Sequence, residues 1–194
     1  MPDGRVVVVW RRLDTPGHEA AELLQTADGW RISGSAVFIH DALPCRLDYV
    51  ILCDRRWQTA RCDVSGFIAT RALSVTLMRD SHSRWTVDGD PAPALDGCVD
   101  VDLAFSPVTN LLPIRRLALE PGASARVQAA WLRFPEVTVE VLDQRYTPRS
   151  ANEYSYESAD GAFRRELKVD ESGLVLEYPG LWVAEAIARS GQPA

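Results

Sequence analysis

The chain has 194 residues, 46% of them hydrophobic and 25% charged, a composition ordinary for a globular protein with one sizeable core. Its net charge of −6 at pH 7 argues against a nucleic-acid partner, because nucleic-acid binders usually present a basic face. No apolar run approaches the roughly 20 residues of a spanning helix. No secretory signal is recognisable, so we expect a cytoplasmic protein without an integral membrane segment.

Alternation of apolar and polar residues dominates the first half of the chain and predicts β-strands. Asp28-Gly29 predicts a tight hairpin turn between strands at 19–26 and 30–38. The Ala-Ala-Glu-Leu-Leu stretch at 20–24 has helical propensity, but the turn and the partner strand favour a strand there. Further strands are predicted at 47–53, 57–64, 72–78 and 84–87.

The segment 96–117 carries the densest polar chemistry of the chain. Asp100 and Asp102 alternate with apolar residues, so a strand here places both carboxylates on one face. Pro107 and Pro113 interrupt any strand ladder because neither can donate a backbone hydrogen bond. We therefore expect a stiff, shaped loop to follow the strand.

The second half again reads as strands joined by tight turns. Asp160-Gly161 predicts a hairpin between strands at 154–158 and 163–169. A short C-terminal helix is predicted at 181–188, after Pro179-Gly180. Further strands are predicted at 114–119, 125–134, 137–142 and 174–178.

These elements predict an all-β fold with minor α content, an antiparallel open or half-closed β-barrel within a single domain, 1–194. The two halves echo each other at nearly constant spacing, with Trp57 matching Tyr146 and Asp80 matching Asp170. An internal duplication would make two similar β-meanders, at about 19–95 and 118–182, joined by 96–117. Coincidence is the alternative, because antiparallel segments match loosely. The exposed edges of an open barrel also make a homodimer plausible.

Each candidate ligand-binding residue has a structural alternative. Asp100 and Asp102 could bind a polar head group or act as an acid/base pair, or they could form a solvated face paired with Arg115 or Arg116. If 115 and 116 lie on a strand, only one of these arginines can face a cavity.

Amides, hydroxyls and aromatic rings extend this set. Thr109 and Asn110 could orient sugar hydroxyls, although Asn is equally a turn residue. Trp57 with Arg61, and Tyr146 with neighbouring arginines, could offer the aromatic and guanidinium surface that sugars or phosphates favour, although such aromatics often only pack in a core.

No recognised catalytic, cofactor or metal motif occurs in the sequence. We therefore assign no catalytic residue, cofactor or metal ligand. The four cysteines lack a Cys-x-x-Cys pair, so we expect reduced thiols in the core, namely Cys45, Cys53, Cys62 and Cys98.

Three segments resemble the bacterial putative glycolipid-binding family, a domain of unknown function. They are Leu95-Asp-Gly-Cys-Val-Asp-Val-Asp-Leu103, Pro107-Val-Thr-Asn-Leu-Leu-Pro-Ile-Arg-Arg116 and Asp170-x-x-Gly173-Leu-Val-x-x-Tyr178-Pro-Gly-Leu-Trp182. The resemblance runs over nearly the whole chain. It implies open, barrel-like sheets similar to those of lipoprotein-localisation carriers, and a lipid-like or glycolipid ligand.

Three functions stay open from the sequence. The first is binding of an amphiphile in a β-barrel cavity with a polar mouth. The second is a hydrolase that uses Asp100 and Asp102 with an arginine. The third is a structural or regulatory protein whose polar segment only joins the two halves. We favour binding, and a non-enzyme over an enzyme.

Overall fold

The computed structural model describes residues 4–191, which form 15 strands and one α-helix. The first eight strands are β1 (Arg5–Arg12), β2 (Gly17–Gln25), β3 (Gly29–His40), β4 (Leu43–Asp54), β5 (Thr59–Ile68), β6 (Arg71–Arg79), β7 (Trp85–Val87) and β8 (Asp90–Pro91). They are followed by β9 (Asp100–Leu103), α1 (Leu111–Leu117), β10 (Ala125–Leu132), β11 (Val139–Ser150), β12 (Glu153–Ser158), β13 (Phe163–Val169), β14 (Val175–Tyr178) and β15 (Trp182–Arg189). The predicted all-β class is confirmed.

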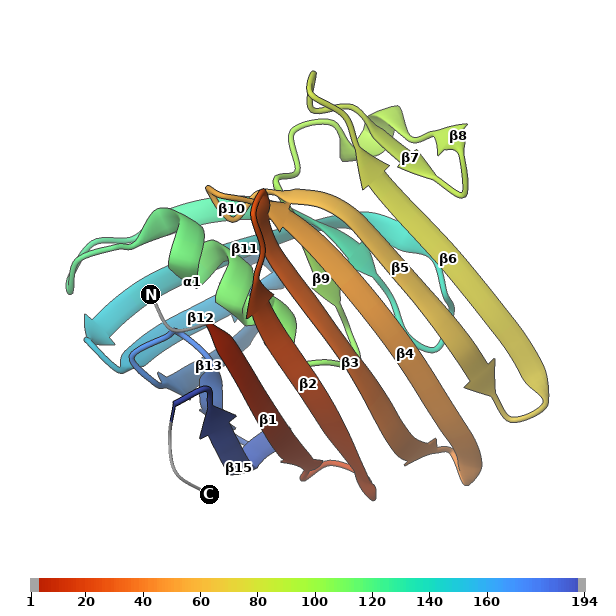
Figure 1. Cartoon of the computed structure of the whole chain (residues 1–194), viewed down its shortest axis with the longest axis horizontal. Helices are drawn as coiled ribbons and strands as arrows, with labels where there is room; N and C mark the ends of the chain where they lie inside the picture. Colours follow the sequence, from red (N-terminus) through yellow and green to blue (C-terminus); the bar gives the residue numbers. More distant parts are fainter. Residues whose placement is uncertain (1–3, 192–194) are drawn as a thin grey trace.

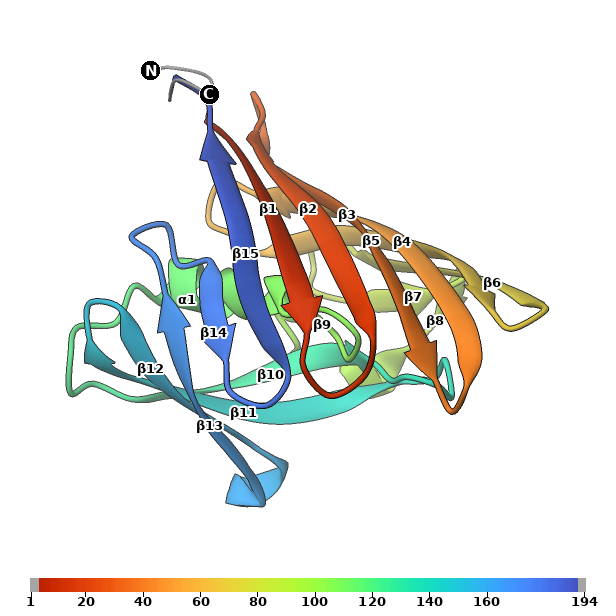
Figure 2. The same cartoon turned by 90° about the horizontal axis from the view of Figure 1, so that it is seen from below.

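All 15 strands belong to one sheet, in the order β8-β7-β6-β5-β4-β3-β2-β1-β15-β14-β13-β12-β11-β10-β9. Within residues 4–191, β9 and β10 are the only strands that pair in parallel. The sheet rolls into two arms with α1 between them, and β1 and β15 pair at its middle (Figures 1 and 2). The edge strand β9 returns to β5, where the amide of Thr59 donates to the carbonyl of Val99 at 3.2 Å. The result is a half-closed barrel.

Alternation decides which side chains fill this barrel. Along β4, every second residue from Cys45 to Cys53 is buried, and the residues between them are partly or fully exposed. Burial of these apolar residues against the neighbouring arm is the main stabilising contribution. The predicted duplication stays a prediction, because a shared meander topology does not require one.

The helix predicted at 181–188 is wrong: this segment forms β15. Pro179-Gly180 makes a turn in which the amide of Leu181 donates to the carbonyl of Tyr178 at 2.9 Å. The strand after the turn pairs with both β14 and β1. These long-range ladders outweigh the helical propensity of the Ala and Glu residues in the segment.

The strand predicted at 114–119 is also wrong, because the chain forms α1 here, preceded by a 3₁₀ turn at Val108–Asn110. Pro113 lies in the first turn of α1, where its missing N–H needs no partner. The helix ends at Ala118, which adopts a left-handed conformation with φ 43° and donates to the carbonyl of Ile114. Its buried face fills the interior of the half-barrel with Leu111, Leu112 and Ile114.

Candidate functional site: a buried polar cluster and an apolar cleft

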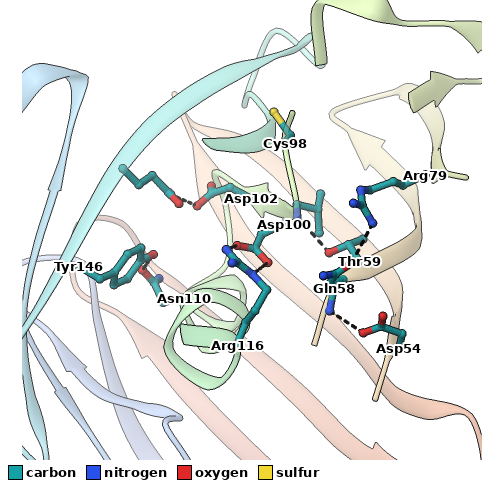
Figure 3. A network of polar contacts seen from close by, with 12 residues as sticks. Asp54, Gln58, Thr59, Arg79, Cys98, Asp100, Asp102, Asn110, Arg116 and Tyr146 are labelled. Carbon is teal, nitrogen blue, oxygen red and sulfur yellow. Dashed lines mark hydrogen bonds and ion pairs between the residues drawn. The ribbon is translucent and has the colours of Figure 1, made fainter. Parts of the chain in front are cut away.

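Asp100 and Arg116 form a bidentate ion pair inside the barrel. Arg116 donates through Nε and Nη2 to the two carboxylate oxygens of Asp100, at 3.0 and 2.5 Å (Figure 3). The Asp100 side chain is 1% exposed, and burial raises the pKa of its carboxyl while Arg116 opposes that rise. A desolvated bidentate pair of this kind fixes the last turn of α1 on β9.

Asp102 lies on the same face of β9 but has a different partner. The Nε2 group of Gln144 donates to Oδ2 of Asp102 at 2.9 Å and to the hydroxyl of Tyr156 at 3.0 Å. Burial and the neighbouring Asp100 carboxylate raise the pKa of Asp102 to about 6. The two carboxylates lie on one face of the strand, as predicted, but one is held by an arginine and the other by an amide.

Thr109, Asn110 and Tyr146 are all buried and bonded to the protein itself. The Tyr146 hydroxyl donates to Oδ1 of Asn110 at 2.9 Å (Figure 3). The Asn110 amide donates to the carbonyl of Pro107 at 3.1 Å. The Thr109 hydroxyl accepts from the amide of Leu103 at 3.4 Å. These contacts hold the turn before α1. We call Asp100, Asp102, Thr109, Asn110, Arg116, Gln144 and Tyr146 the polar cluster.

Glu19 is a buried carboxyl that the sequence analysis did not select. Its Oε1 accepts from the Tyr49 hydroxyl at 2.5 Å and from the Ser106 hydroxyl at 2.6 Å, while Oε2 has no hydrogen-bond partner among the described residues. Complete burial raises the pKa of Glu19 to about 7. Glu19, Ala21 and Leu23 occupy every second position of β2 and therefore share its buried face. That spacing was the signal that could have revealed Glu19 as buried.

Trp57 lies outside the polar cluster in a strained turn. Its φ of 65° is rare for a bulky residue. The Asp54 side chain holds this turn, because its Oδ1 accepts from the amides of Arg56 at 2.8 Å and Gln58 at 2.9 Å. The Trp57 ring stacks on Trp30 with centroids 4.3 Å apart.

The arginine whose guanidinium contacts the Trp57 ring is Arg115 and not Arg61. The Arg115 guanidinium lies 5.2 Å from the centroid of the Trp57 ring. Arg61 pairs with Asp63 at 2.6 and 2.8 Å on β5. The predicted combination of an aromatic ring with an arginine therefore occurs with a different arginine from the one expected.

An apolar cleft of about 220 Å³ opens beside this stack. Its apolar wall consists of Val6, Leu23, Trp30 and Trp57. Arginines from β1, α1 and β15 also line it, namely Arg5, Arg115 and Arg189. We call this space the apolar cleft.

Between residues 4 and 191 no cluster of three or more His, Cys, Asp or Glu side chains could hold a metal ion. No helix in this range is long and apolar enough to cross a membrane. The four cysteines are buried and free.

Fold and site define a class of protein: a half-closed β-barrel that encloses one helix and carries an apolar cleft at its surface. The chain belongs to the putative glycolipid-binding family, whose model matches residues 7–184. It is similar to the crystal structure of a DUF1089 family protein from Pseudomonas aeruginosa, with 33% sequence identity and a TM-score of 0.76, over 85% of this chain and 91% of that one. No curated protein matches the chain. The resemblance noted from the sequence is thus confirmed.

Proposed function

We propose that this protein binds a lipid-like or glycolipid amphiphile, with the apolar part of the ligand in the apolar cleft. The family description supports the ligand class. The observation that carries the proposal is the stacked pair of Trp30 and Trp57 in the cleft wall. Alkyl chains and the apolar faces of sugars both pack against tryptophan rings. The strained backbone at Trp57 is also of a kind that is found often at ligand sites.

The size of the cleft limits how much of a ligand it can hold. Its volume of about 220 Å³ is below the roughly 300–1,000 Å³ of pockets that enclose a drug-sized ligand. Each 100 Å² of apolar ligand surface buried there would contribute about 2.5 kcal/mol. We therefore propose that the cleft takes one end of the apolar chain and the part of the head group nearest to it.

In this proposal the polar cluster supports the fold instead of forming the mouth of a cavity. Asp100, Asn110 and Tyr146 each donate to or accept from another buried group. The hydrolase alternative would need Asp100 released from Arg116 to act beside Asp102, so we place it second. The cytoplasmic location and the homodimer stay predictions from the sequence.

Calorimetric titration with n-octyl β-D-glucoside, below its critical micelle concentration, tests the proposal. We expect binding to the wild-type protein and at least a tenfold loss of affinity on Trp30→Ala, because half of the stack is removed. Trp131→Ala is the matched control, since Trp131 is a half-buried tryptophan of β10 that also lies near an arginine but does not line the cleft. Equal loss on both variants, with both folded, would overturn the assignment of the cleft.

Native mass spectrometry of the purified protein gives an independent test. An amphiphile that copurifies with the wild-type protein, and is lost on Trp30→Ala, supports the proposal. A protein that carries no amphiphile and binds neither n-octyl β-D-glucoside nor other octyl amphiphiles refutes it.

A further inference from the structure

The charged side chains that line the apolar cleft directly are all arginines. Its lining includes three arginines, and none of the described residues that line it is acidic. The chain as a whole is acidic, with 27 Asp and Glu against 21 Lys and Arg. At such a cleft, an arginine without a carboxylate partner leaves positive charge that attracts anions locally.

Two of these arginines already have carboxylate partners. Arg5 forms an ion pair with Glu22, and Arg189 forms one with Asp170. Arg115 forms no ion pair or side-chain hydrogen bond with any described residue. Its guanidinium lies over the Trp57 ring. A contact with an aromatic face leaves the N–H donors at the edge of the guanidinium available to an anion.

The position of Arg115 is fixed by the packing of α1. A Cβ added at Gly173 would lie 3.0 Å from Cγ2 of Ile114 and 3.5 Å from Cδ of Arg115, so the turn before β14 and the helix approach closely. Asp170 holds that turn by accepting from the amides of Ser172 at 2.8 Å and Leu174 at 3.0 Å. The guanidinium is thereby presented at the cleft with part of its conformational entropy already lost.

We propose that the apolar cleft selects amphiphiles with an anionic head group, a carboxylate or a phosphate, and that Arg115 binds that group. This inference rests on the proposed function, which it deepens by assigning the charge of the head group. A guanidinium matches both anions because it can donate two parallel hydrogen bonds. The alkyl chain or sugar next to the head group would lie against Trp30 and Trp57.

Three probes with the same chain test the charge preference: n-octyl phosphate, n-octyl β-D-glucoside and octyltrimethylammonium. Inorganic phosphate serves as the free head group. We expect n-octyl phosphate to bind the wild-type protein about tenfold more tightly than the glucoside, and the cation to bind most weakly. Raising the salt concentration should weaken only the phosphate probe, because screening acts on charge.

Arg115→Gln should reduce the affinity for n-octyl phosphate by a clearly larger factor than the affinity for n-octyl β-D-glucoside, because only the phosphate probe uses the charge of the guanidinium. Arg133→Gln is the matched control, because Arg133 also lies over a tryptophan, at 5.3 Å from Trp131, but outside the cleft. Urea unfolding checks that both variants fold. The salt dependence needs no variant, so it tests the proposal even if Arg115→Gln does not fold.

The outcomes separate this inference from the function on which it rests. Equal binding of phosphate and glucoside probes, without salt dependence, would overturn the anionic preference and leave amphiphile binding intact. Inorganic phosphate binding as tightly as n-octyl phosphate would show a free-anion site and overturn it too. If no octyl probe binds, the proposed function fails as well.

Discussion

Glu19 makes the stability of the fold depend on pH. Its carboxyl is fully buried, and its pKa is raised from 4.5 to about 7. Between these two pH values the unfolded chain releases this proton while the folded protein keeps it, so stability falls as pH rises. Below pH 4.5 the protonated form is favoured in both states, and the full contribution of Glu19 is present.

The magnitude follows from the pKa difference. With a folded pKa of about 7 and an unfolded pKa of 4.5, the contribution of Glu19 to the free energy of unfolding decreases by roughly 2–3 kcal/mol between pH 5 and pH 8. The slope is steepest between the two pKa values, where it approaches about 1.4 kcal/mol per pH unit, and it flattens above pH 7. Glu19→Gln abolishes the titration and retains an oxygen that can accept from Tyr49 and Ser106.

The assay is urea unfolding of the wild-type protein and Glu19→Gln at pH 5, 6, 7 and 8. The difference in stability between the two proteins isolates Glu19, because the other titrating groups are common to both. We expect wild type to lose roughly 2–3 kcal/mol relative to the variant across the series. A difference that is constant with pH, or that grows in the opposite direction, would refute the reasoning.

Glu185→Gln is the control for the same substitution at an exposed site. A hydrogen bond from Arg11 lowers the pKa of Glu185, so the stabilising contribution of this group is lost only when the pH falls towards that lowered pKa. Its difference from wild type should therefore stay flat between pH 5 and pH 8.

Three further substitutions test how the two sites are built. Arg116→Ala leaves the Asp100 carboxyl buried without its ion-pair partner, so we expect a loss of about 3–5 kcal/mol in urea unfolding. Gly173→Ala forces a left-handed φ of 86° on a residue with a Cβ, and we expect thermal unfolding to show a cost of about 1–2 kcal/mol. Asp54→Ala removes both side-chain hydrogen bonds that hold the turn at Trp57. It should weaken binding of n-octyl β-D-glucoside while the rest of the fold stays intact, as far-ultraviolet circular dichroism would check.

The sequence predicted the parts of the fold that depend on local pattern. The strand at 19–26 corresponds to β2, and its hairpin with β3 follows Asp28-Gly29 as expected. Period-two burial and tight turns are local properties, so no knowledge of distant partners was needed. The apolar run from Val6 to Trp10 was not assigned to a strand. It forms β1, which pairs with β2 on one side and with β15, from the other end of the chain, on the other side.

The errors came from the two segments whose structure depends on distant contacts. No strand runs through the prolines at 107 and 113, as expected, but a strand was predicted to resume at 114–119, although proline is equally accepted in the first turn of a helix. The Ala-Glu-Ala residues of β15 have helical propensity, and only pairing with β1 makes them a strand. Likewise Trp57 was expected beside Arg61, its neighbour in sequence, whereas folding brings it to Arg115.

Arg115 and Arg116 show why the helix matters for the proposed function. On a strand, adjacent side chains point to opposite faces, so one of the two arginines would lie on the outer surface of the sheet. On α1 they are about 100° apart, so Arg116 reaches Asp100 in the interior while Arg115 reaches the cleft beside Trp57. The ion pair and the buried apolar face of α1 together hold the rotation of the helix, and that rotation determines where the Arg115 guanidinium lies. We therefore expect a change at Arg116 to alter both stability and the cleft, and a change at Arg115 to act mainly on the cleft.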